Sequence, residues 1–187
     1  MSLKVTQNIH AMRRRESSYV DFYKPQDQIC FCVDIKGLLL KFSYSDDPNN
    51  WYLFMDSSQR SFKAILIEKN TLKIIPVAYS SENKKETIEQ VLNKIKYDSY
   101  KWYISGDFKM IGLLMGLQAG NTQHSCFLCQ WRSRGKNQYD IEDWQMRNEY
   151  RVGEQNINAI PLVNRSNILI PPLHIKLGLF KNFVKAL

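Results

Sequence analysis

The sequence predicts a mixed α/β domain of three antiparallel strands, a helix, a fourth strand and a second helix, followed by an irregular segment and a C-terminal helix. Three observations predict this class. Strand-like apolar runs follow one another with only short polar breaks. An amphipathic segment then separates the third run from a fourth, as a crossover connection would. No internal repeat or run of eighteen apolar residues is present, so neither a solenoid nor a membrane span is indicated.

The three strands of the expected meander follow a loop of turn-forming residues at 45–50. The runs WYLFMDS, SFKAILIE and LKIIPVAY predict strands over 51–57, 61–68 and 72–79. Pro76 lacks a backbone N–H, which predicts either an edge position or a bulge for the third strand.

One helix is expected before the fourth strand and one after it, with the strand itself over 102–105. Residues 83–97 predict an amphipathic helix, because Ile88, Val91, Leu92 and Ile95 recur on one face. Residues 108–118 predict a buried helix that Gly120 and Asn121 can end. Further along, residues 168–170 predict a short fifth strand, and 173–187 a helix.

The expected organisation begins with a basic flexible arm over residues 1–29, followed by a lead-in segment and loop over 30–50. The core spans 51–120, an insertion containing two cysteines spans 121–165, and a strand and helix span 166–187. The chain ends inside an apolar stretch, so we expect this last part to be truncated.

The charge balance favours a polyanionic partner. Lys and Arg number 26 against 18 Asp and Glu, a net charge of +8, and each cation that meets a phosphate releases a counterion. The polar N-terminus carries no secretory signal, so the four cysteines are expected to be reduced thiols of a nuclear or cytoplasmic, non-secreted protein. DNA is one such polyanion, a homo-oligomer is left open in addition, and no membrane association is expected.

Two aspartates are the candidate catalytic and metal-binding residues. Asp56 lies inside the first strand, where a buried carboxylate needs a cation or hydrogen-bond donors. Asp107 closes the fourth strand, directly before the buried helix. If the first and fourth strands are neighbours, as the meander and crossover indicate, the carboxylates converge and can hold Mg²⁺ or Mn²⁺. The alternatives are a turn role for Asp56, a helix N-cap role for Asp107, and Asp34 as the first acid.

The pair Cys126 and Cys129 has the spacing of a zinc knuckle, in which both thiolates bind one Zn²⁺ at about 2.3 Å. His174 is the preferred third ligand, and the fourth ligand has no assigned position. A redox pair or two buried thiols are the alternatives. Cys30 and Cys32 have poor zinc spacing and are expected to be buried or incidental.

The stretch QWRSRGK over 130–136 is a candidate nucleic-acid contact. Trp131 can stack on bases, and phosphates can be contacted by Arg132, Arg134 and Lys136. A solvated loop anchored by one buried tryptophan is the alternative.

Three stretches resemble a known family. WYLFMDSSQRSFKAILIEKNTLKIIPVAYS resembles the opening strands of an RNase H-like nuclease core. KWYISGDFKMIGLLMGLQAGNTQHSCFLCQWRSRGK resembles its second-acid strand and helix running into a CxxC knuckle, and LIPPLHIKLGLFKNFVKAL a downstream histidine segment. Over about residues 30–187 the chain is similar to transposon-derived invertebrate proteins of the DDE transposase branch that includes the hAT and Transib elements and the vertebrate antigen-receptor recombinase.

The resemblance implies an RNase H-like fold with a zinc-binding insertion. Asp56 and Asp107 would be the first two acids of the DDE triad, and Cys126, Cys129 and His174 would belong to a structural zinc site. The implied chemistry is strand nicking by activated water, then attack of a 3′-hydroxyl on target DNA.

Two departures from the family pattern stand out. No position matches the third acid, because the glutamates of the insertion, Glu142, Glu149 and Glu154, precede the histidine segment. Leu179 stands where some relatives have a second histidine. We therefore expect a fragment of a transposase core that is inactive alone, with a non-catalytic, zinc-containing DNA-binding protein derived from a transposon as the alternative. A redox or zinc-dependent interaction module without nucleic acid is a third possibility.

Overall fold

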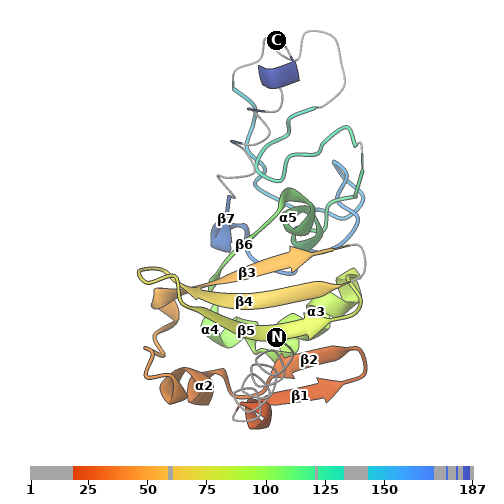
Figure 1. The fold of residues 1–187 in the computed structure, drawn as a ribbon. Helices are drawn as coiled ribbons and strands as arrows, with labels where there is room; N and C mark the ends of the chain where they lie inside the picture. Colours follow the sequence, from red (N-terminus) through yellow and green to blue (C-terminus); the bar gives the residue numbers. More distant parts are fainter. Residues whose placement is uncertain are drawn as a thin grey trace, which may run out of the picture. The chain divides into compact units, whose positions relative to one another are not determined.

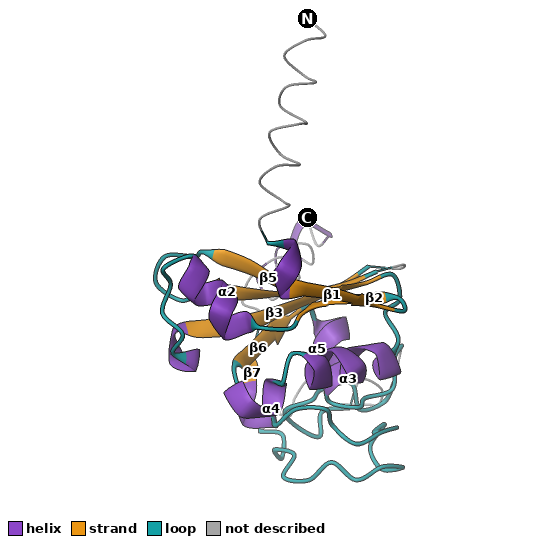
Figure 2. Ribbon diagram, turned by 90° about the horizontal axis from the view of Figure 1, so that it is seen from below, coloured by secondary structure: helices purple, strands orange, loops and turns teal. Residues whose placement is uncertain are grey.

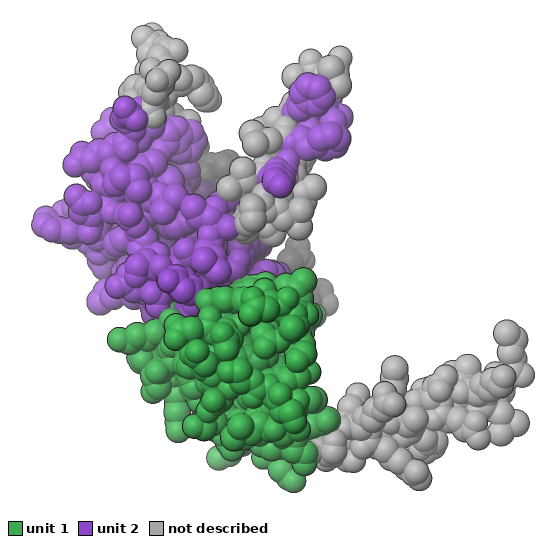
Figure 3. All heavy atoms as spheres, turned by 90° about the vertical axis from the view of Figure 1, so that its left-hand side faces the viewer, with its two compact units in different colours: residues 1–52, 58–101 green, residues 53–57, 102–187 purple. Residues whose placement is uncertain are grey.

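The protein is a mixed α/β chain with a seven-stranded mixed sheet in the part that the structure describes (Figures 1 and 2). The structure is a computed structural model that describes residues 19–58, 61–120, 122–132 and 143–170, together with Lys176, Phe180 and residues 183–185. The chain divides into two compact units, coloured separately in Figure 3. Unit 1 comprises Met1–Tyr52 and Ser58–Lys101, and unit 2 comprises Leu53–Ser57 and Trp102–Leu187.

Unit 1 contributes four antiparallel strands in the order β1-β2-β5-β4. They are β1 (Tyr23–Gln26), β2 (Ile29–Cys32), β4 (Phe62–Glu68) and β5 (Ile74–Ser80). The first two lie in the segments that the sequence assigned to an arm and a lead-in. β1 is short, mostly exposed and contains Pro25, as is usual for a strand at a sheet edge.

A bulge interrupts the pairing of β4 with β5, as Pro76 predicted. Ala64 pairs with Ala78, whereas Ile65 pairs with Pro76, so the register shifts by one residue at Val77. The alternative prediction, that Pro76 marks an edge strand, is wrong, because β5 lies between β2 and β4. The bulge accommodates a residue without a backbone donor inside the sheet.

Helices cover both faces of the unit 1 strands (Figure 2). One side is covered by α2 (Ile35–Lys41), and the other by α3 (Lys85–Lys94), which leads into the single turn of α4 (Tyr97–Tyr100). The predicted apolar stripe of α3 is confirmed, since its four members, Ile88, Val91, Leu92 and Ile95, are at most 5% exposed. The helix is shorter than predicted because Lys96 adopts a left-handed conformation with φ 54°.

Unit 2 contributes three strands in the order β3-β6-β7. They are β3 (Trp51–Ser57), whose first two residues belong to unit 1, β6 (Tyr103–Gly106) and β7 (Ile168–Leu169). β7 is the predicted fifth strand and runs parallel to β6. Helix α5 (Phe108–Leu114) follows β6. The apolar side chains of this unit that are 0% exposed are those of Leu53, Met55, Ile104, Met110, Ile111, Leu114 and Met115.

α5 ends earlier than the sequence predicted. Gly116, with φ +68°, follows the C-cap, and the backbone N–H groups of Gly116 and Leu117 donate to the carbonyls of Leu113 and Gly112 at 3.1 and 2.8 Å. This is the Schellman arrangement, which satisfies carbonyls that the helix leaves free. The prediction that Gly120 and Asn121 end the helix is therefore wrong.

The predicted C-terminal helix over 173–187 lies outside the described residues, apart from the five named above. Within the described ranges, no helix has the length and apolarity needed to cross a membrane.

Candidate functional site

Asp56 is exposed, so the expectation of a buried carboxylate at this position is wrong. Side chains alternate along β3, and Leu53 and Met55 point into the core at 0% exposure. The Asp56 side chain therefore projects from the opposite face of the strand. The carboxylate needs no partner to offset burial there, and it is open to a cation from solution.

Asp107 is half-buried and caps α5. Its Oδ1 accepts a hydrogen bond of 2.6 Å from the backbone N–H of Met110, and its backbone is extended. The N-cap interpretation of this residue is thus confirmed. Capping engages one carboxylate oxygen and does not by itself exclude a second role.

β3 and β6 are neighbours in the sheet, as the meander and crossover predicted. Gly106 marks the point of close approach, because a Cβ built there would lie only 2.7 Å from the Met55 carbonyl oxygen. Asp56 is the residue after Met55, and Asp107 is the residue after Gly106. The structure therefore places both candidate acids at the same point of two adjacent strands.

Asp34, the rival first acid, is a helix cap. Its Oδ1 accepts a hydrogen bond of 2.8 Å from the Gly37 N–H at the start of α2. It follows β2, whose neighbours in the sheet are β1 and β5.

Cys126 and Cys129 lie in one loop of unit 2 with half-buried thiols. The Leu128 N–H lies 3.4 Å from the Cys126 Sγ. Burial raises the pKa of the Cys129 thiol, the Trp131 backbone N–H opposes that rise, and the neighbouring Cys126 adds to it. Two adjacent thiols, each with a backbone donor, form half of the ligand set of a zinc site.

Arg147 organises this loop and was not found from the sequence. Its side chain is only 2% exposed. Nε donates to the carbonyls of Cys126 and Cys129 at 2.8 and 3.1 Å, and one terminal nitrogen donates to those of His124 and Gln155 at 3.2 and 3.1 Å. An arginine in an irregular polar segment carries no sequence signal of such burial.

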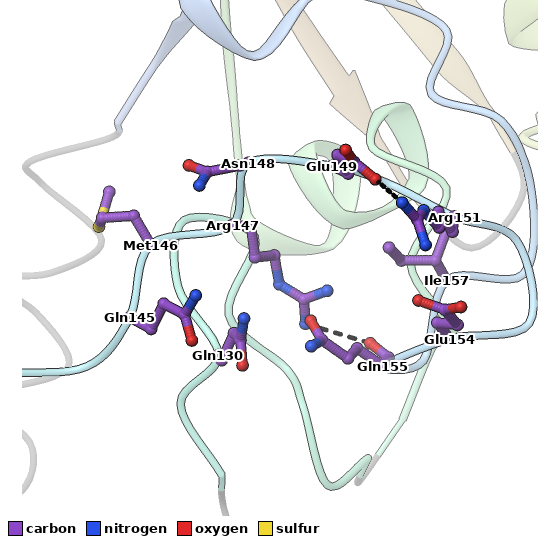
Figure 4. Close-up of a pocket in the computed structure, with 10 residues that line it drawn as sticks. All are labelled: Gln130, Gln145, Met146, Arg147, Asn148, Glu149, Arg151, Glu154, Gln155 and Ile157. Atoms are coloured by element: carbon purple, nitrogen blue, oxygen red, sulfur yellow. Dashed lines mark hydrogen bonds and ion pairs between the residues drawn. The ribbon is translucent and has the colours of Figure 1, made fainter.

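The buried charge of Arg147 has no carboxylate partner among the described residues. Burial lowers the pKa of Arg147, while the nearby Tyr150 and the two cysteines raise it. The remaining terminal nitrogen, Nη1, is buried without a hydrogen-bond partner. Arg147 lines a cavity of about 310 Å³ together with Glu154, Gln155 and Ile157. Figure 4 shows the guanidinium among these residues. Thiolates at the neighbouring cysteines would offset this charge.

The described residues do not complete a metal site around the thiols. None of them forms a group of three or more His, Cys, Asp or Glu side chains around one point. His124 lies in the same loop, with a buried Nδ1 that has no hydrogen-bond partner, and burial lowers its pKa. His174, the predicted third ligand, lies outside the described residues. Cys126 and Cys129 thus fit two of four zinc positions.

The candidate nucleic-acid residues are described only in part. Trp131 is half-buried and Arg132 is exposed, while Arg134 and Lys136 lie outside the described residues. Of the glutamates considered for the third acid, Glu149 pairs with Arg151. Glu154 lines the cavity beside Arg147.

The fold and these residues define a mixed α/β protein with one acid at the end of each of two neighbouring strands and a two-thiol loop. Residues 11–163 match the model of a family described as Domain of unknown function (DUF8703), and the chain belongs to that family. No curated protein and no solved structure gives a significant match.

Proposed function

We propose that this chain carries the first two acids of a metal-dependent DNA strand-cleavage and transfer centre of the DDE type, on an RNase H-like sheet. The observation that carries the proposal is the close approach of Gly106 to Met55, which brings the ends of β3 and β6 together. Asp56 and Asp107 are the next residues on the two chains.

The alternation of side chains supports a shared face for the two acids. Met55 and Gly106 are buried, so the residues that follow them leave on the other side of the strands. Mg²⁺ accepts one or two carboxylates, with water completing its octahedral shell. In this proposal Asp56 offers both oxygens, and Asp107 offers the oxygen that does not cap α5.

The same proposal assigns Cys126, Cys129 and His174 to a structural Zn²⁺ site. Its support is the Arg147 guanidinium, which holds both cysteine carbonyls and contributes a buried positive charge beside the thiols. That charge opposes the effect of burial, which raises the pKa of the Cys129 thiol, and zinc binds the thiolate.

The first test measures Mn²⁺ binding by the loss of the free-ion EPR signal, together with Mn²⁺-dependent nicking of supercoiled DNA. Asp107→Asn keeps a good N-cap and removes only the charge, which separates the two roles of this residue. We expect D56N and D107N each to weaken Mn²⁺ binding on the order of tenfold or more. Asp34→Asn is the matched control, because Asp34 is also a capping aspartate but lies after β2.

Equal Mn²⁺ affinity in the wild type, D56N and D107N would refute the two-acid site. Nicking that survives both substitutions would show that any cleavage comes from another site or another protein.

The second candidate function is a non-catalytic, zinc-containing DNA-binding protein. The observation that favours it is the loop held by Arg147, which continues directly into Trp131 and the exposed Arg132. We expect one zinc per chain by elemental analysis, lost in Cys126→Ser. DNA binding without Mn²⁺ binding would favour this function over the first, and freshly purified protein without zinc would exclude the zinc site.

A further inference from the structure

A second cavity of unit 2 is lined by Phe108, the residue that follows Asp107 in the chain. It measures about 480 Å³ and is mostly apolar, lined by the first turn of α5, the segment after that helix and the cysteine loop. Small-molecule sites in proteins commonly have about 300–1,000 Å³. Gly112 opens onto this space, since a Cβ built there would meet only the Leu117 Cβ, at 4.0 Å.

Three aromatic side chains line the cavity: the buried Phe127, and Phe108 and Trp131, each of which is followed by an exposed cation. Phe108, which is 47% exposed, precedes Lys109, and the half-buried Trp131 precedes Arg132. Proteins that bind single-stranded nucleic acid combine these features, because bases stack on aromatic rings while phosphates lie on neighbouring cations. An apolar peptide would gain from the rings but not from the cations that follow Phe108 and Trp131.

We propose that this cavity binds an unpaired nucleobase of a DNA strand, stacked against Phe108 and Trp131, with the flanking phosphates on Lys109 and Arg132. The inference deepens the proposed function and rests on it, because Phe108 directly follows Asp107. A base held here would position the adjoining phosphodiester near the carboxylates.

The test fills the cavity with a larger side chain of the protein itself. Gly112→Leu adds a side chain at a position where a Cβ would meet only the Leu117 Cβ, at 4.0 Å, and Gly112→Ala is the matched control. Binding of a fluorescein-labelled thymidine 15-mer is measured by anisotropy in EDTA, so that the carboxylate site takes no part. An oligonucleotide of the same length without bases is the second probe.

We expect wild type and G112A to prefer the intact oligonucleotide over the abasic one by about 5- to 100-fold. G112L should lose that preference and bind both probes alike. Trp131→Ala should give the same loss, which keeps the test valid if G112L does not fold. Circular dichroism and thermal melting check the fold of each variant.

An equal affinity of the wild type for intact and abasic strands would overturn the inference, as would a preference that persists in both G112L and W131A. A third contrary result is that G112L abolishes binding of the apolar dye bis-ANS but leaves oligonucleotide binding unchanged, which would assign the cavity to an apolar partner. D56N and D107N should retain the preference in EDTA, so failure of the metal site and failure of the base site are distinguishable.

Discussion

At the scale of single residues, Arg147 differs most from what its sequence context indicates. Its guanidinium is buried, and its hydrogen bonds go to main-chain carbonyls rather than to a carboxylate. Carbonyl oxygens offset part of the cost of removing a cation from water. The cysteine loop therefore takes its shape from a residue about twenty positions further along the chain.

Replacing Arg147 by methionine should destabilise unit 2. The change leaves the carbonyls of Cys126, Cys129 and His124 without their donors, and we expect a loss of about 3 kcal/mol in the free energy of unfolding. Arg147→Lys keeps the charge but cannot donate in a planar fork, so it should recover only part of the loss. Urea unfolding followed by tryptophan fluorescence measures both variants.

Arg151→Met is the control for that experiment. Arg151 pairs with Glu149 on the surface, where both side chains are more than 60% exposed. Such pairs contribute little, so the change should stay within about 0.5 kcal/mol. Equal stability of R147M and R151M would contradict the role assigned to Arg147.

The stability of unit 1 should fall in alkaline solution because of Cys32. Burial raises the pKa of its thiol from 9.0 to about 11, and the nearby Asp34 backbone lowers it only in part. A raised pKa in the folded state means that this contribution is complete below pH 9 and is lost as the pH rises through 11. We expect a loss on the order of 1–2 kcal/mol across this window.

Cys32→Ala should show a flatter dependence of unfolding free energy on pH between 9 and 11. Tyr23→Phe is the comparison. Burial raises the Tyr23 pKa from 10.0 to about 12, so the pH dependence of this variant should differ from that of wild type only above pH 10, in addition to a constant loss from the missing hydrogen bond to the Pro76 carbonyl. If the unfolding free energies of C32A and wild type changed in parallel between pH 9 and 11, Cys32 would not titrate as stated.

At the scale of elements, two glycines around α5 should respond in opposite ways to the same substitution. Gly106→Ala directs a methyl group at the Met55 carbonyl oxygen, 2.7 Å away, and should cost about 1–3 kcal/mol. Gly112→Ala adds a methyl group in open space inside the helix and should gain about 0.5–1 kcal/mol. Thermal unfolding of the two variants shows directly whether each substitution raises or lowers the stability.

Because Gly106 lies at the contact of β3 with β6, G106A should also weaken Mn²⁺ binding if the two acids share an ion. G112A should leave Mn²⁺ binding unchanged. A neutral or stabilising G106A would mean that the strands do not approach as closely as described.

Strong periodicity made some elements predictable and its absence hid others. The bounds of β3 are those predicted, and α3 buries its predicted stripe, because both patterns repeat over several residues. β1 was missed because its four residues alternate in no clear way and include Pro25. The end of α5 was misplaced because the sequence offers two glycines, Gly116 and Gly120, and only the fold shows which one caps the helix.

The candidate site was predictable in one respect. The crossover order places the strand ends of Asp56 and Asp107 side by side, and this follows from topology alone. The exposure of Asp56 did not follow, because a carboxylate in an apolar run can face either side of a strand. The burial of Arg147 depends on contacts between segments far apart in sequence, which no local pattern records.

At the scale of the whole molecule, the net charge of +8 should make the proposed nucleic-acid binding strongly dependent on salt. The logarithm of the association constant should fall linearly with the logarithm of the salt concentration. Arg132→Gln should make that slope shallower by about 0.7 for single-stranded DNA, the contribution of one phosphate contact. Fluorescence anisotropy at several KCl concentrations measures the slope.

Lys36→Gln is the control for the salt series, because Lys36 is an exposed cation of unit 1 paired with Asp46 at 2.9 Å. Its slope should match that of wild type. If both variants change the slope equally, binding is a general consequence of net charge rather than of the surface around Trp131.

The cap of α5 has a practical consequence. The Met110 amide N–H donates a hydrogen bond to a carboxylate oxygen of Asp107, the residue proposed to bind a divalent ion. An ion that drew this carboxylate away would loosen the first turn and speed the exchange of that amide with solvent deuterium, whereas an ion bound through the other oxygen would leave the exchange slow. One resonance in a proton spectrum can therefore report how the ion is held, without any DNA present.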